Sequence, residues 1–486
     1  MSEPPTNVGT AGLGETSGFA GAAVPVGPVV PVGPATVRPA TRLRGTPGLP
    51  GDKSISHRAL LFAALAEGES RIEGAGDGAD VRTTAALLSR LGVTIERLAD
   101  DGRRVSYRVR SPGVDGLHEA EGVLDCANSG TTLRLSAGIL AGLPAHHVLD
   151  GDASLRRRPV ARIIQPLRLM GAVLHARRND SLPPLTVFGH TPLRAIDVTT
   201  SVPSAQVKSA ILLAGLRADG RTTVREAIAT RDHTERMLRA RGVPVGCELS
   251  DRAGAAVAWT VEGGIRVRAI DERVPGDVSA AAFWLVVGAI HPDAELSLRA
   301  VGTNPTRRAV IDLLRRMGAR IEETPLTGSP RPTAGTAADE ASDVGEPTAD
   351  LTVRTSALEA IDIGPAEVAA AIDEIPILCL AATQARGRTT IRGAGELRHK
   401  ESDRIAGIAA GLIALGAHLS VDGDDITIDG PTPLTGAPTA SLDDHRLAMT
   451  FAVAGLIARG ETIIDAPSSA SISYPGFFRE LEGVRA

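Results

Sequence analysis

The sequence predicts an α/β (α+β) protein of two globular domains, each built from three β-α-β-α-β-β units. An apolar, helix-like stretch of about ten residues, followed by a short β-like run, recurs six times along the chain. The period is nearly constant, with successive spacings of 74, 78, 74, 93 and 73 residues between the turn residues Gly68, Gly142, Gly220, Ala294, Gly387 and Gly460. Apolar residues make up 43% of the 486 residues, enough to bury two cores.

The rest of each unit follows from the segments between these turns. A second amphipathic stretch ends in a glycine and a β-branched run, as in LLSRLGVTIE and LLRRMGARIE. Glycine suits the position after a helix, where the backbone takes positive φ. The alternative, that alanine-rich sequence creates a false period, does not account for a spacing that holds over five intervals.

Composition sets the domain boundaries. Residues 1–35 are almost uncharged and rich in Gly, Pro and Ala, which predicts a disordered tail. Residues 325–349 have the same character and predict an inserted surface loop; without these 25 residues the 93-residue spacing becomes 68. The simplest division assigns residues 36–49 and 272–486 to domain one and residues 50–271 to domain two.

Charge and cysteine content exclude several classes of protein. The net charge of −5 argues against a general grip on nucleic acid. The three cysteines are far apart and form neither a zinc pattern nor a disulfide framework, so we expect a reducing cytoplasm and no metal. No apolar run is long enough to span a membrane. Only three of the 52 basic residues are lysines, Lys53, Lys208 and Lys400, which suggests positions where arginine fails.

The first apolar helix starts with a candidate anion site. Lys53, Ser54 and Arg58 follow the turn Pro50-Gly51-Asp52. A helix N-terminus offers free N–H groups and the positive end of the helix dipole. The alternative is an ordinary helix capped by Ser54 or Ser56.

The second and third helix starts are also rich in donors. Gly130 lies in the turn NSGTT, where it would let a ligand approach the backbone, and the neighbouring Cys126 is interpreted as a small buried residue. Ser204, Gln206 and Lys208 open the third helix. Between these helices, Arg158 adjoins a proline that starts a helix, whereas the rest of the run RRR is interpreted as solvated.

The polar segment RDHTE carries Arg231 and His233. His233 could act as a base, but its polar neighbours favour a structural or solvated role.

The C-terminal half supplies titratable groups. Asp373 and Glu374 precede an apolar helix, KESDR packs Lys400, Glu401 and Arg404 together, and DDHR places Asp444, His445 and Arg446 at the sixth apolar helix. If the helix starts converge, one cleft gathers Lys53, Arg58, Arg158, Lys400, Arg404 and Arg446, with Asp373 and Glu401 as its carboxylates. Such a cleft suits small polyanions bearing phosphate and carboxylate groups.

The chemistry of the cleft is limited by what the sequence lacks. There is no Walker motif, no Rossmann glycine fingerprint, no cluster of metal ligands and no nucleophilic serine elbow. Acid–base chemistry remains, with Asp373 as the base, Glu401 as the acid and Lys400 tuning both. We therefore expect no cofactor.

Together these segments resemble the family of 5-enolpyruvylshikimate-3-phosphate (EPSP) synthases. LPGDKSISHRA, NSGTTLR, SAQVK, RDHTE, IDEIP, KESDR and DHRLAM occur in the order and spacing of that family, from about residue 36 to the end. The resemblance implies a two-domain enolpyruvyl transferase fold with the active site in the interdomain cleft. It also implies transfer of the enolpyruvyl group of phosphoenolpyruvate to the 5-hydroxyl of shikimate 3-phosphate, with release of phosphate, in chorismate and aromatic amino acid biosynthesis.

The resemblance assigns roles to individual residues. Shikimate 3-phosphate would be held by Lys53, Ser54, Arg58, Ser204, Ala205, Gln206, Arg231, Asp373 and Lys400. Phosphoenolpyruvate would be held by Lys53, Gly130, Arg158, Gln206, Arg404 and Arg446. Asp373 would take the hydroxyl proton, and Glu401 with Lys400 would protonate the methylene carbon, while Lys53 completes the catalytic set. These two small molecules are the expected partners, and we expect a monomer.

The motifs GDK, SAQVK, RDHTE and NPTR are those of class II members of this family. Class I members carry a lysine where this chain has Ile472, so that contact to phosphoenolpyruvate is absent here. Class II often gives tolerance to glyphosate, but Gly130 is not the bulkier residue seen in some tolerant members, so glyphosate sensitivity stays open. UDP-N-acetylglucosamine enolpyruvyl transferases share the fold and the donor, but have Lys-Asn where this chain has Lys53-Ser54. A non-catalytic anion-binding relative is the third alternative, and the intact Asp373, Lys400 and Glu401 argue against it.

Overall fold

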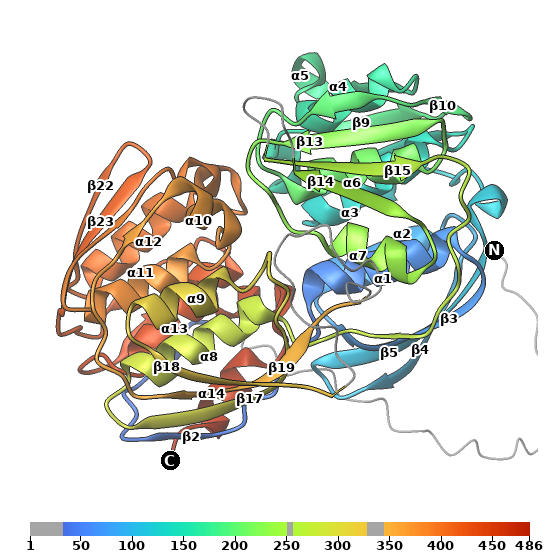
Figure 1. Ribbon diagram of the computed structural model, residues 1–486. Helices are drawn as coiled ribbons and strands as arrows, with labels where there is room; N and C mark the ends of the chain where they lie inside the picture. The colour runs from blue at the N-terminus through green and yellow to red at the C-terminus, as the bar shows by residue number, and fades with distance from the viewer. Residues whose placement is uncertain (1–32, 250–255, 328–344) are drawn as a thin grey trace, which may run out of the picture.

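The computed structural model describes residues 33–249, 256–327 and 345–486 (Figure 1). Their buried apolar side chains form two separate cores. One core draws on residues between Val37 and Leu49 and between Val278 and Val484, and the other on residues between Ile55 and Val274. We call these two parts domain one and domain two. The chain starts in domain one, crosses to domain two and returns.

Domain two repeats one arrangement three times: a buried helix, a strand, a second helix and a pair of strands. Its principal elements are α1 Lys53–Leu65, β3 Glu67–Gly76, α2 Ala79–Ser89, β4 Thr94–Asp100, β5 Arg104–Pro112, β6 Leu124–Asp125, α3 Gly130–Ala141, β7 His146–Asp150, α4 Ala161–Leu169, β8 Val173–Ala176, β9 Leu182–Phe188, β11 Asp197–Thr199, α6 Ala205–Gly215, β13 Arg221–Glu226, α7 His233–Ala240, β14 Val245–Leu249, β15 Val257–Glu262 and β16 Glu272–Arg273.

Domain one follows the same plan. Its principal elements are β1 Ala35–Val37, β2 Leu43–Gly45, α8 Val278–Ile290, β17 Ala294–Gly302, α9 Ala309–Arg316, β18 Arg320–Pro325, β19 Thr348–Arg354, β20 Asp362–Ile363, α10 Pro365–Ala370, α11 Ile375–Gln384, β21 Gly387–Ile391, α12 Arg404–Ala414, β22 His418–Asp422, β23 Asp425–Gly430, β24 Pro438–Thr439, α13 His445–Gly455, β25 Thr462–Ile464 and α14 Phe477–Gly483.

The sheets carry the repeat. Five four-stranded sheets in the described part of the chain share one order, in which a short strand runs parallel to the first strand of the unit and the remaining two are antiparallel, as in β6-β7-β9-β8. The sixth is reduced to β1-β25-β24, where β1 from the other end of domain one pairs antiparallel with β25. This architecture confirms the predicted fold class of six related units.

The glycines after the second helices behave as the sequence predicts. Gly92, Gly171, Gly242, Gly318 and Gly416 all have positive φ, between 77° and 104°. A side chain there would strain the backbone. The repeat is therefore fixed by local backbone chemistry as well as by apolar spacing.

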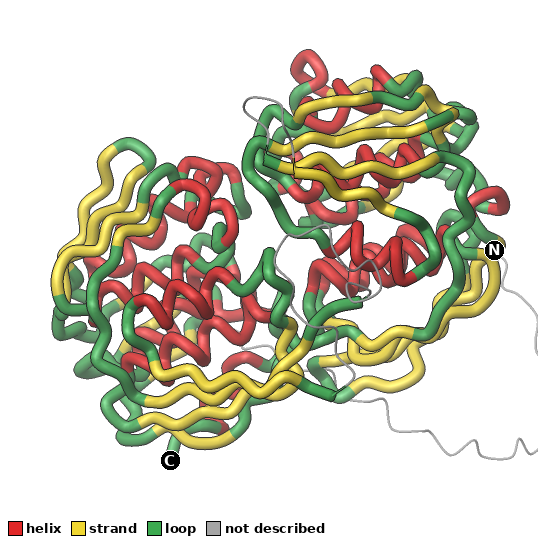
Figure 2. The backbone as a smooth tube through the Cα atoms, in the orientation of Figure 1, coloured by secondary structure: helices red, strands yellow, loops and turns green. Residues whose placement is uncertain are grey.

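The first helix of each unit lies inside its domain, and the sheets lie outside (Figures 1 and 2). Helices α1, α3 and α6 pack together in domain two, and α8, α11 and α13 in domain one. Close packing needs small residues: a Cβ on Gly138 of α3 would lie 2.3 Å from the carbonyl oxygen of Ala210 in α6. Most side chains of these helices are apolar, and their charged residues all lie within the first six positions.

Two crossover segments join the domains side by side. Gly51 and Gly276 form an antiparallel bridge. Asp52 N–H donates to the Pro275 carbonyl at 2.8 Å, and Asp277 N–H donates to the Pro50 carbonyl at 3.0 Å. Asp52 and Asp277 then cap α1 and α8, so both helices start at the boundary between the domains.

Three boundaries differ from the expectation. The predicted domain boundary after residue 271 lies too early, because β16 pairs with β3 of domain two and Val274 belongs to the core of that domain. Pro325 ends β18 and Thr348 begins β19, so both ends of the predicted 325–349 loop belong to a sheet. Residues 328–344 lie outside the described residues. So does the predicted tail as far as residue 32, while Ala35 already belongs to β1. None of the described helices combines the length and apolarity needed to cross a membrane.

Candidate active site

A cavity lies between the two domains, where the buried helices begin. Its walls include residues at or next to the N-terminal ends of α1, α3, α6, α8, α11 and α13: Lys53, Gly130, Ala205, Ser279, Asp373 and Arg446. Six helix starts therefore face one space. This is the convergence on which the single cleft expected from the sequence depended. Each brings unpaired N–H groups and the positive end of a helix dipole, so the cavity favours anions before any side chain is counted.

The side chains strengthen this preference. Within the described part of the chain, nine cationic side chains line the cavity: Lys53, Arg134, Arg158, Arg162, Arg231, Arg307, Lys400, Arg404 and Arg446. Five carboxylates line it: Asp80, Asp277, Asp373, Glu396 and Glu401. The two expected carboxylates are thus too few, yet nine minus five still leaves a formal excess of four positive charges. The whole chain, by contrast, carries −5.

The start of α1 differs in detail from the expectation. Asp52, rather than Ser54 or Ser56, caps the helix, and its side chain accepts from Ile55 N–H at 2.9 Å. Ser54 is therefore released to line the cavity. Lys53 Nζ lies 3.1 Å from Asp80 Oδ2, a residue that the sequence did not single out.

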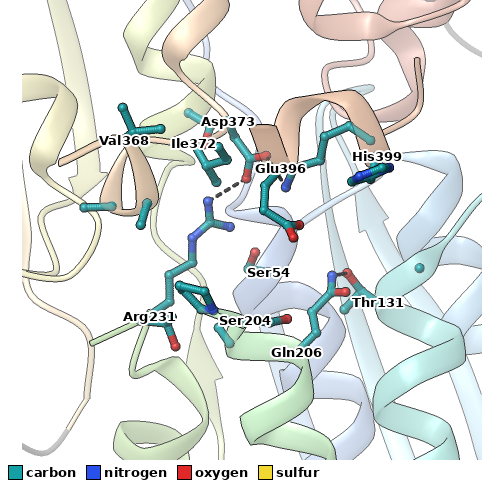
Figure 3. Close-up of a pocket in the computed structure, with 18 of the residues that line it drawn as sticks. Ser54, Thr131, Ser204, Gln206, Arg231, Val368, Ile372, Asp373, Glu396 and His399 are labelled. Carbon is teal, nitrogen blue, oxygen red and sulfur yellow. Dashed lines mark hydrogen bonds and ion pairs between the residues drawn. The ribbon is translucent and has the colours of Figure 1, made fainter. Parts of the chain in front are cut away.

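The start of α3 and α6 holds a linked set of polar groups. Arg134 donates from Nη1 to Gln206 Oε1 at 2.6 Å, and Gln206 donates from Nε2 to Thr131 Oγ1 at 2.9 Å. Figure 3 shows Gln206 and Thr131 together on the floor of the cavity. Burial, together with neighbouring Arg162 and Arg158, lowers the pKa of Arg134 to about 9. The sequence located Arg134 one turn into α3 but gave it no ligand.

Asp373 receives cations from both domains. Its Oδ2 lies 2.5 Å from Arg231 Nη2 of domain two, a contact drawn in Figure 3. Its Oδ1 lies 3.4 Å from both Lys400 Nζ and Arg404 Nη1 of domain one. Burial disfavours the charged carboxylate, but Lys400, Arg231, Arg446 and Arg404 together hold the pKa of Asp373 well below its usual value.

Glu401 is held on the opposite side of Arg404. Its Oε2 lies 2.6 Å from Arg404 Nη2, and its Oε1 lies 3.6 Å from Arg158 Nη2. Burial opposes ionisation, yet Arg404 and Arg158 lower the pKa of Glu401 well below its usual value. These two arginines therefore favour the charged form of the Glu401 carboxylate.

Lys400 experiences the reverse. Burial lowers the pKa of its ammonium, Asp373 raises it, and Arg404 lowers it again, so that the net shift is downward. Pairing with Asp373 alone would raise this pKa; the surrounding guanidinium groups and burial outweigh it. Lys400 is thus the cation of this cluster that most readily gives up a proton.

Four arginines of the cavity have buried donors without a hydrogen-bond partner in the described residues: Arg134, Arg158, Arg307 and Arg446. The Nε atoms of Arg158 and Arg446 are buried and have no hydrogen-bond partner in the described residues. Arg446 makes one weak bond, from Nη1 to the Ser279 carbonyl at 3.4 Å, and Arg158 donates to Asn128 Oδ1 at 2.7 Å. A bound anion would complete both guanidinium groups.

Three residues named by the sequence lie away from the cavity surface. Arg58 does not line it: its guanidinium donates to Thr234 Oγ1, Ser209 Oγ and the Ser54 carbonyl at 2.8 to 3.0 Å. Arg58 thus lies beneath the floor of the cavity, and all three of its guanidinium nitrogens are bonded to protein groups. His233 is buried, 1% exposed, and its Nδ1 lies 2.7 Å from Glu346 Oε1, which confirms a structural rather than a solvated role.

Lys208 has partners that no local motif could reveal. Its Nζ lies 2.9 Å from Glu226 Oε2 and 3.0 Å from Glu235 Oε1, and all three side chains are fully buried. The same ammonium lies 4.9 Å from the centre of the Trp259 ring. Glu226 ends β13 and Glu235 lies in α7, so the cluster depends on the folded unit.

The described residues contain no group of three or more His, Cys, Asp and Glu side chains that could hold a metal ion. Cys126 is fully buried, and burial raises the pKa of its thiol far above the usual value. The titratable side chains that line the cavity are carboxylates, ammonium groups, guanidinium groups and two imidazoles, those of His399 and His445.

Known proteins match this chain over most of its length. The family model described as EPSP synthase (3-phosphoshikimate 1-carboxyvinyltransferase) matches residues 37–481. The 3-phosphoshikimate 1-carboxyvinyltransferase of Gloeobacter violaceus is 50% identical over 452 residues, which cover 93% of this chain and 98% of that protein. The enzyme of the same name from Synechococcus sp. is 47% identical over 442 residues, covering 90% and 96%.

Solved structures agree. The EPSP synthase of Acinetobacter baumannii superposes with a TM-score of 0.78 at 37% identity, covering 93% of this chain and 98% of that one. The enolpyruvyl transferase NikO of Streptomyces tendae superposes with a TM-score of 0.70 at 18% identity, covering 93% and 97%. At that identity the likeness concerns the fold alone.

Proposed function

Because this chain belongs to the EPSP synthase family, we propose that its cleft transfers the enolpyruvyl group of phosphoenolpyruvate to the 5-hydroxyl of shikimate 3-phosphate and releases phosphate. Family membership confirms the resemblance drawn from the motifs. It favours this reaction over transfer to UDP-N-acetylglucosamine. The observation that carries the proposal is a cavity that is lined by nine cations and faced by six helix starts, with two carboxylates, Asp373 and Glu401, on either side of Arg404.

We assign the acceptor to the domain-two side of the cavity. Shikimate 3-phosphate would contact Lys53, Ser54, Ser204, Ala205, Gln206, Arg231, Asp373 and Lys400. The support is geometric, since Ser204 caps α6, Ser54 opens α1, and both face the cavity near Arg231 (Figure 3). Arg58 would act from below by holding the Ser54 carbonyl, because its own nitrogens are occupied.

We assign the donor to the guanidinium groups around Glu401. Phosphoenolpyruvate would contact Lys53, Gly130, Arg158, Gln206, Arg404 and Arg446. Its phosphate and carboxylate suit the guanidinium groups of Arg158 and Arg446, which line the cavity. Gly130 suits close approach, because a Cβ there would lie 2.6 Å from Arg134 Nη1 and 3.4 Å from Arg158 Nη1.

Asp373 is the proposed base for the acceptor hydroxyl. Among the protein's own groups its pKa is held well below its usual value, because four cations face it. The substrate phosphate and carboxylate would share those cations and weaken their pull, so binding raises the basicity of Asp373. The hydroxyl oxygen then attacks C2 of phosphoenolpyruvate while its proton passes to Asp373.

Glu401 is the proposed acid for the methylene carbon. The two arginines that lower its pKa, Arg404 and Arg158, are the ones assigned to phosphoenolpyruvate. When the donor takes up these guanidinium groups, Glu401 loses stabilisation of its charge and can carry a proton, with Lys400 as the adjacent group of lowered pKa. Protonation at C3 gives a tetrahedral adduct, which loses phosphate and returns the C3 proton to restore the double bond.

We further propose that one chain acts alone in a reducing compartment. The support is that the cavity is lined by residues from both domains of the same chain, and that Cys126, Cys247 and Cys379 are free thiols. A homogeneous monomer by light scattering, with full activity, is the expected result. A dimer required for activity would contradict it.

The direct test of the reaction is phosphate release. Purified protein mixed with shikimate 3-phosphate and phosphoenolpyruvate should release one phosphate for each enolpyruvyl ether formed, as followed by 31P NMR. Omitting either substrate is the control. Binding of both ligands without any phosphate release would instead favour a non-catalytic anion-binding protein.

A further inference from the structure

The segment between β13 and α7 connects the cavity to a buried cluster behind it. Arg231 points into the cavity toward Asp373, whereas the next two residues, Asp232 and His233, are 5% and 1% exposed and face the other way. The segment belongs to domain two, but Arg231, Asp232 and His233 also make polar contacts with domain one. It therefore forms a bridge between the domains beside the proposed acceptor site.

Three side chains of domain one contact Asp232 and His233. Asn304 donates from Nδ2 to Asp232 Oδ1 at 2.7 Å and to Glu346 Oε2 at 2.9 Å. Glu346 Oε1 pairs with His233 Nδ1 at 2.7 Å. The Thr306 hydroxyl lies 3.1 Å from Asp232 Oδ1 and accepts from Asp232 N–H at 3.3 Å. We call Asp232, His233, Asn304, Thr306 and Glu346 the interdomain latch.

The charges of the latch favour a fixed geometry. Asp232 also accepts from Arg236 Nε at 2.9 Å. Burial alone would raise the pKa of Asp232. Arg236, the hydrogen bond from Asn304 and the nearby His233 outweigh burial, so the net shift is downward and the carboxylate stays ionised. Charge-assisted hydrogen bonds to a buried carboxylate are strong and directional. The buried Asp232 therefore has little freedom to shift.

The backbone of Arg231 is also restricted in position, because one peptide bond joins it to Asp232. The N–H of that bond donates to Thr306, and the far end of the Arg231 side chain pairs with Asp373. Both anchors belong to domain one, although Arg231 belongs to domain two. A long, flexible side chain held at its base loses less conformational freedom when it binds a ligand.

We propose that the interdomain latch positions Arg231 for the phosphorylated acceptor. The proposal rests on the proposed function, which brings shikimate 3-phosphate to Arg231. The latch residues do not touch the reacting atoms; they are positioning residues. A cluster that only stabilised the fold would leave ligand affinity of the folded protein unchanged.

The first test is Asn304→Ala, which removes the donor shared by Asp232 and Glu346. We expect the Kd and KM for shikimate 3-phosphate to rise about 10- to 100-fold, the range for losing hydrogen bonds to charged groups. The KM for phosphoenolpyruvate should change far less. Ser441→Ala is the matched control, because the buried Ser441 hydroxyl donates to Asp465 at 2.6 Å within domain one alone.

The second test is a double-mutant cycle with Arg231→Ala. If the latch acts through Arg231, adding Asn304→Ala to Arg231→Ala should cost little further affinity, measured by calorimetry. Losses that multiply would overturn the proposal. So would an Asn304→Ala protein that binds shikimate 3-phosphate like the parent.

A conservative variant covers the case in which Asn304→Ala fails to fold. His233→Asn keeps an amide donor near the position of Nδ1 and should retain acceptor affinity within a few-fold, whereas His233→Leu should lose it. Equal affinities for these two variants would overturn the latch. A parent protein that neither binds shikimate 3-phosphate nor releases phosphate would instead overturn the proposed function.

Discussion

Lys208 and Lys400 show how differently one residue type is used in two regions of the same molecule. Lys208 is fully buried between Glu226 and Glu235, and these carboxylates outweigh the cost of burial and raise the pKa of its ammonium. Lys400 keeps 28% of its side chain exposed to the cavity, and burial and neighbouring arginines lower its pKa despite Asp373. In the first region the lysine is outnumbered by carboxylates; in the second, cations are in excess.

This difference separates stability from function. A cluster in which every charge has a protein partner supports the fold, and removing one partner exposes the others to an apolar core. A cavity with four more cations than carboxylates has a net positive charge that attracts an anionic ligand. We therefore expect substitutions in the cavity to change catalysis and substitutions around Lys208 to change the free energy of unfolding.

The largest effect is expected for Asp373→Asn. Removing the proposed base should lower kcat by about 10²- to 10⁴-fold, the range for general acid–base catalysis. Affinity for shikimate 3-phosphate should fall much less, because the cations around residue 373 remain. Steady-state phosphate release and calorimetry separate the two. Asp80→Asn, at a cavity carboxylate bonded to Lys53, is the control and should cost less; equal losses would remove the special role of Asp373.

Lys208→Met should be the most damaging change to stability. It leaves two buried carboxylates without their cation, at a cost of about 3 to 5 kcal/mol in the free energy of unfolding. No atom of Lys208 lines the cavity, so kcat of the folded fraction should change far less. Urea unfolding measures the first and active-site titration the second. Arg221→Met, which breaks an exposed pair with Glu262, is the matched control and should unfold near the parent midpoint.

Lys400→Arg tests the other half of the comparison. A planar guanidinium keeps the charge but displaces the donor from Asp373, so we expect about a 100-fold loss of kcat, the size typical of small misplacements in a site. Because the pKa of Lys400 is lowered, its ammonium loses its proton at a pH below the ordinary lysine pKa. The kcat/KM of the parent should therefore fall as the pH rises through this lowered pKa.

In the Lys400→Arg variant, the alkaline fall of the remaining activity should move to higher pH, because guanidinium stays protonated. A pH profile of kcat/KM from 6 to 10.5 decides this. Full activity of the variant, or an unchanged alkaline limb, would contradict the claim that arginine fails at position 400.

How much of this was available from the sequence depends on whether a property is local. Helix starts recur with the repeat, so the gathering of Lys53, Arg158, Lys400 and Arg446 at one cavity could be predicted. The positive φ of the glycines after the second helices is likewise a property of one residue. The direction of a side chain is not local: Arg58 turns beneath the floor toward Ser209 and Thr234, which come from α6 and α7.

The partners of Lys208 were out of reach for the same reason. Glu226 and Glu235 belong to different elements and reach Lys208 only when β13 and α7 pack on α6. Nothing in the motif SAQVK encodes that packing. The predicted loop of residues 325–349 failed at its edges because composition does not report strand pairing, which extends β18 to Pro325 and starts β19 at Thr348.

The smallest expected effect concerns Glu235. One ammonium cannot neutralise two carboxylates, and burial raises the pKa of Glu235 even though Lys208 opposes the shift. A carboxyl whose folded pKa lies above its unfolded value stabilises the fold fully below the unfolded value, about 4.3, and that contribution is lost as the pH rises through the folded pKa. Ionising Glu235 thus weakens the folded protein.

Glu235→Gln removes this titration while leaving Glu226 to pair with Lys208. Relative to the parent, the variant should become progressively more stable as the pH rises from about 4.3 through the folded pKa of Glu235, by up to about 1 kcal/mol for each unit of pKa shift. Urea unfolding at pH 4 to 8 measures the difference. A variant that loses stability over this range would mean that Glu226 and Glu235 are both fully charged. The cluster around Lys208 would then tolerate an excess of negative charge, as the cavity tolerates an excess of positive charge.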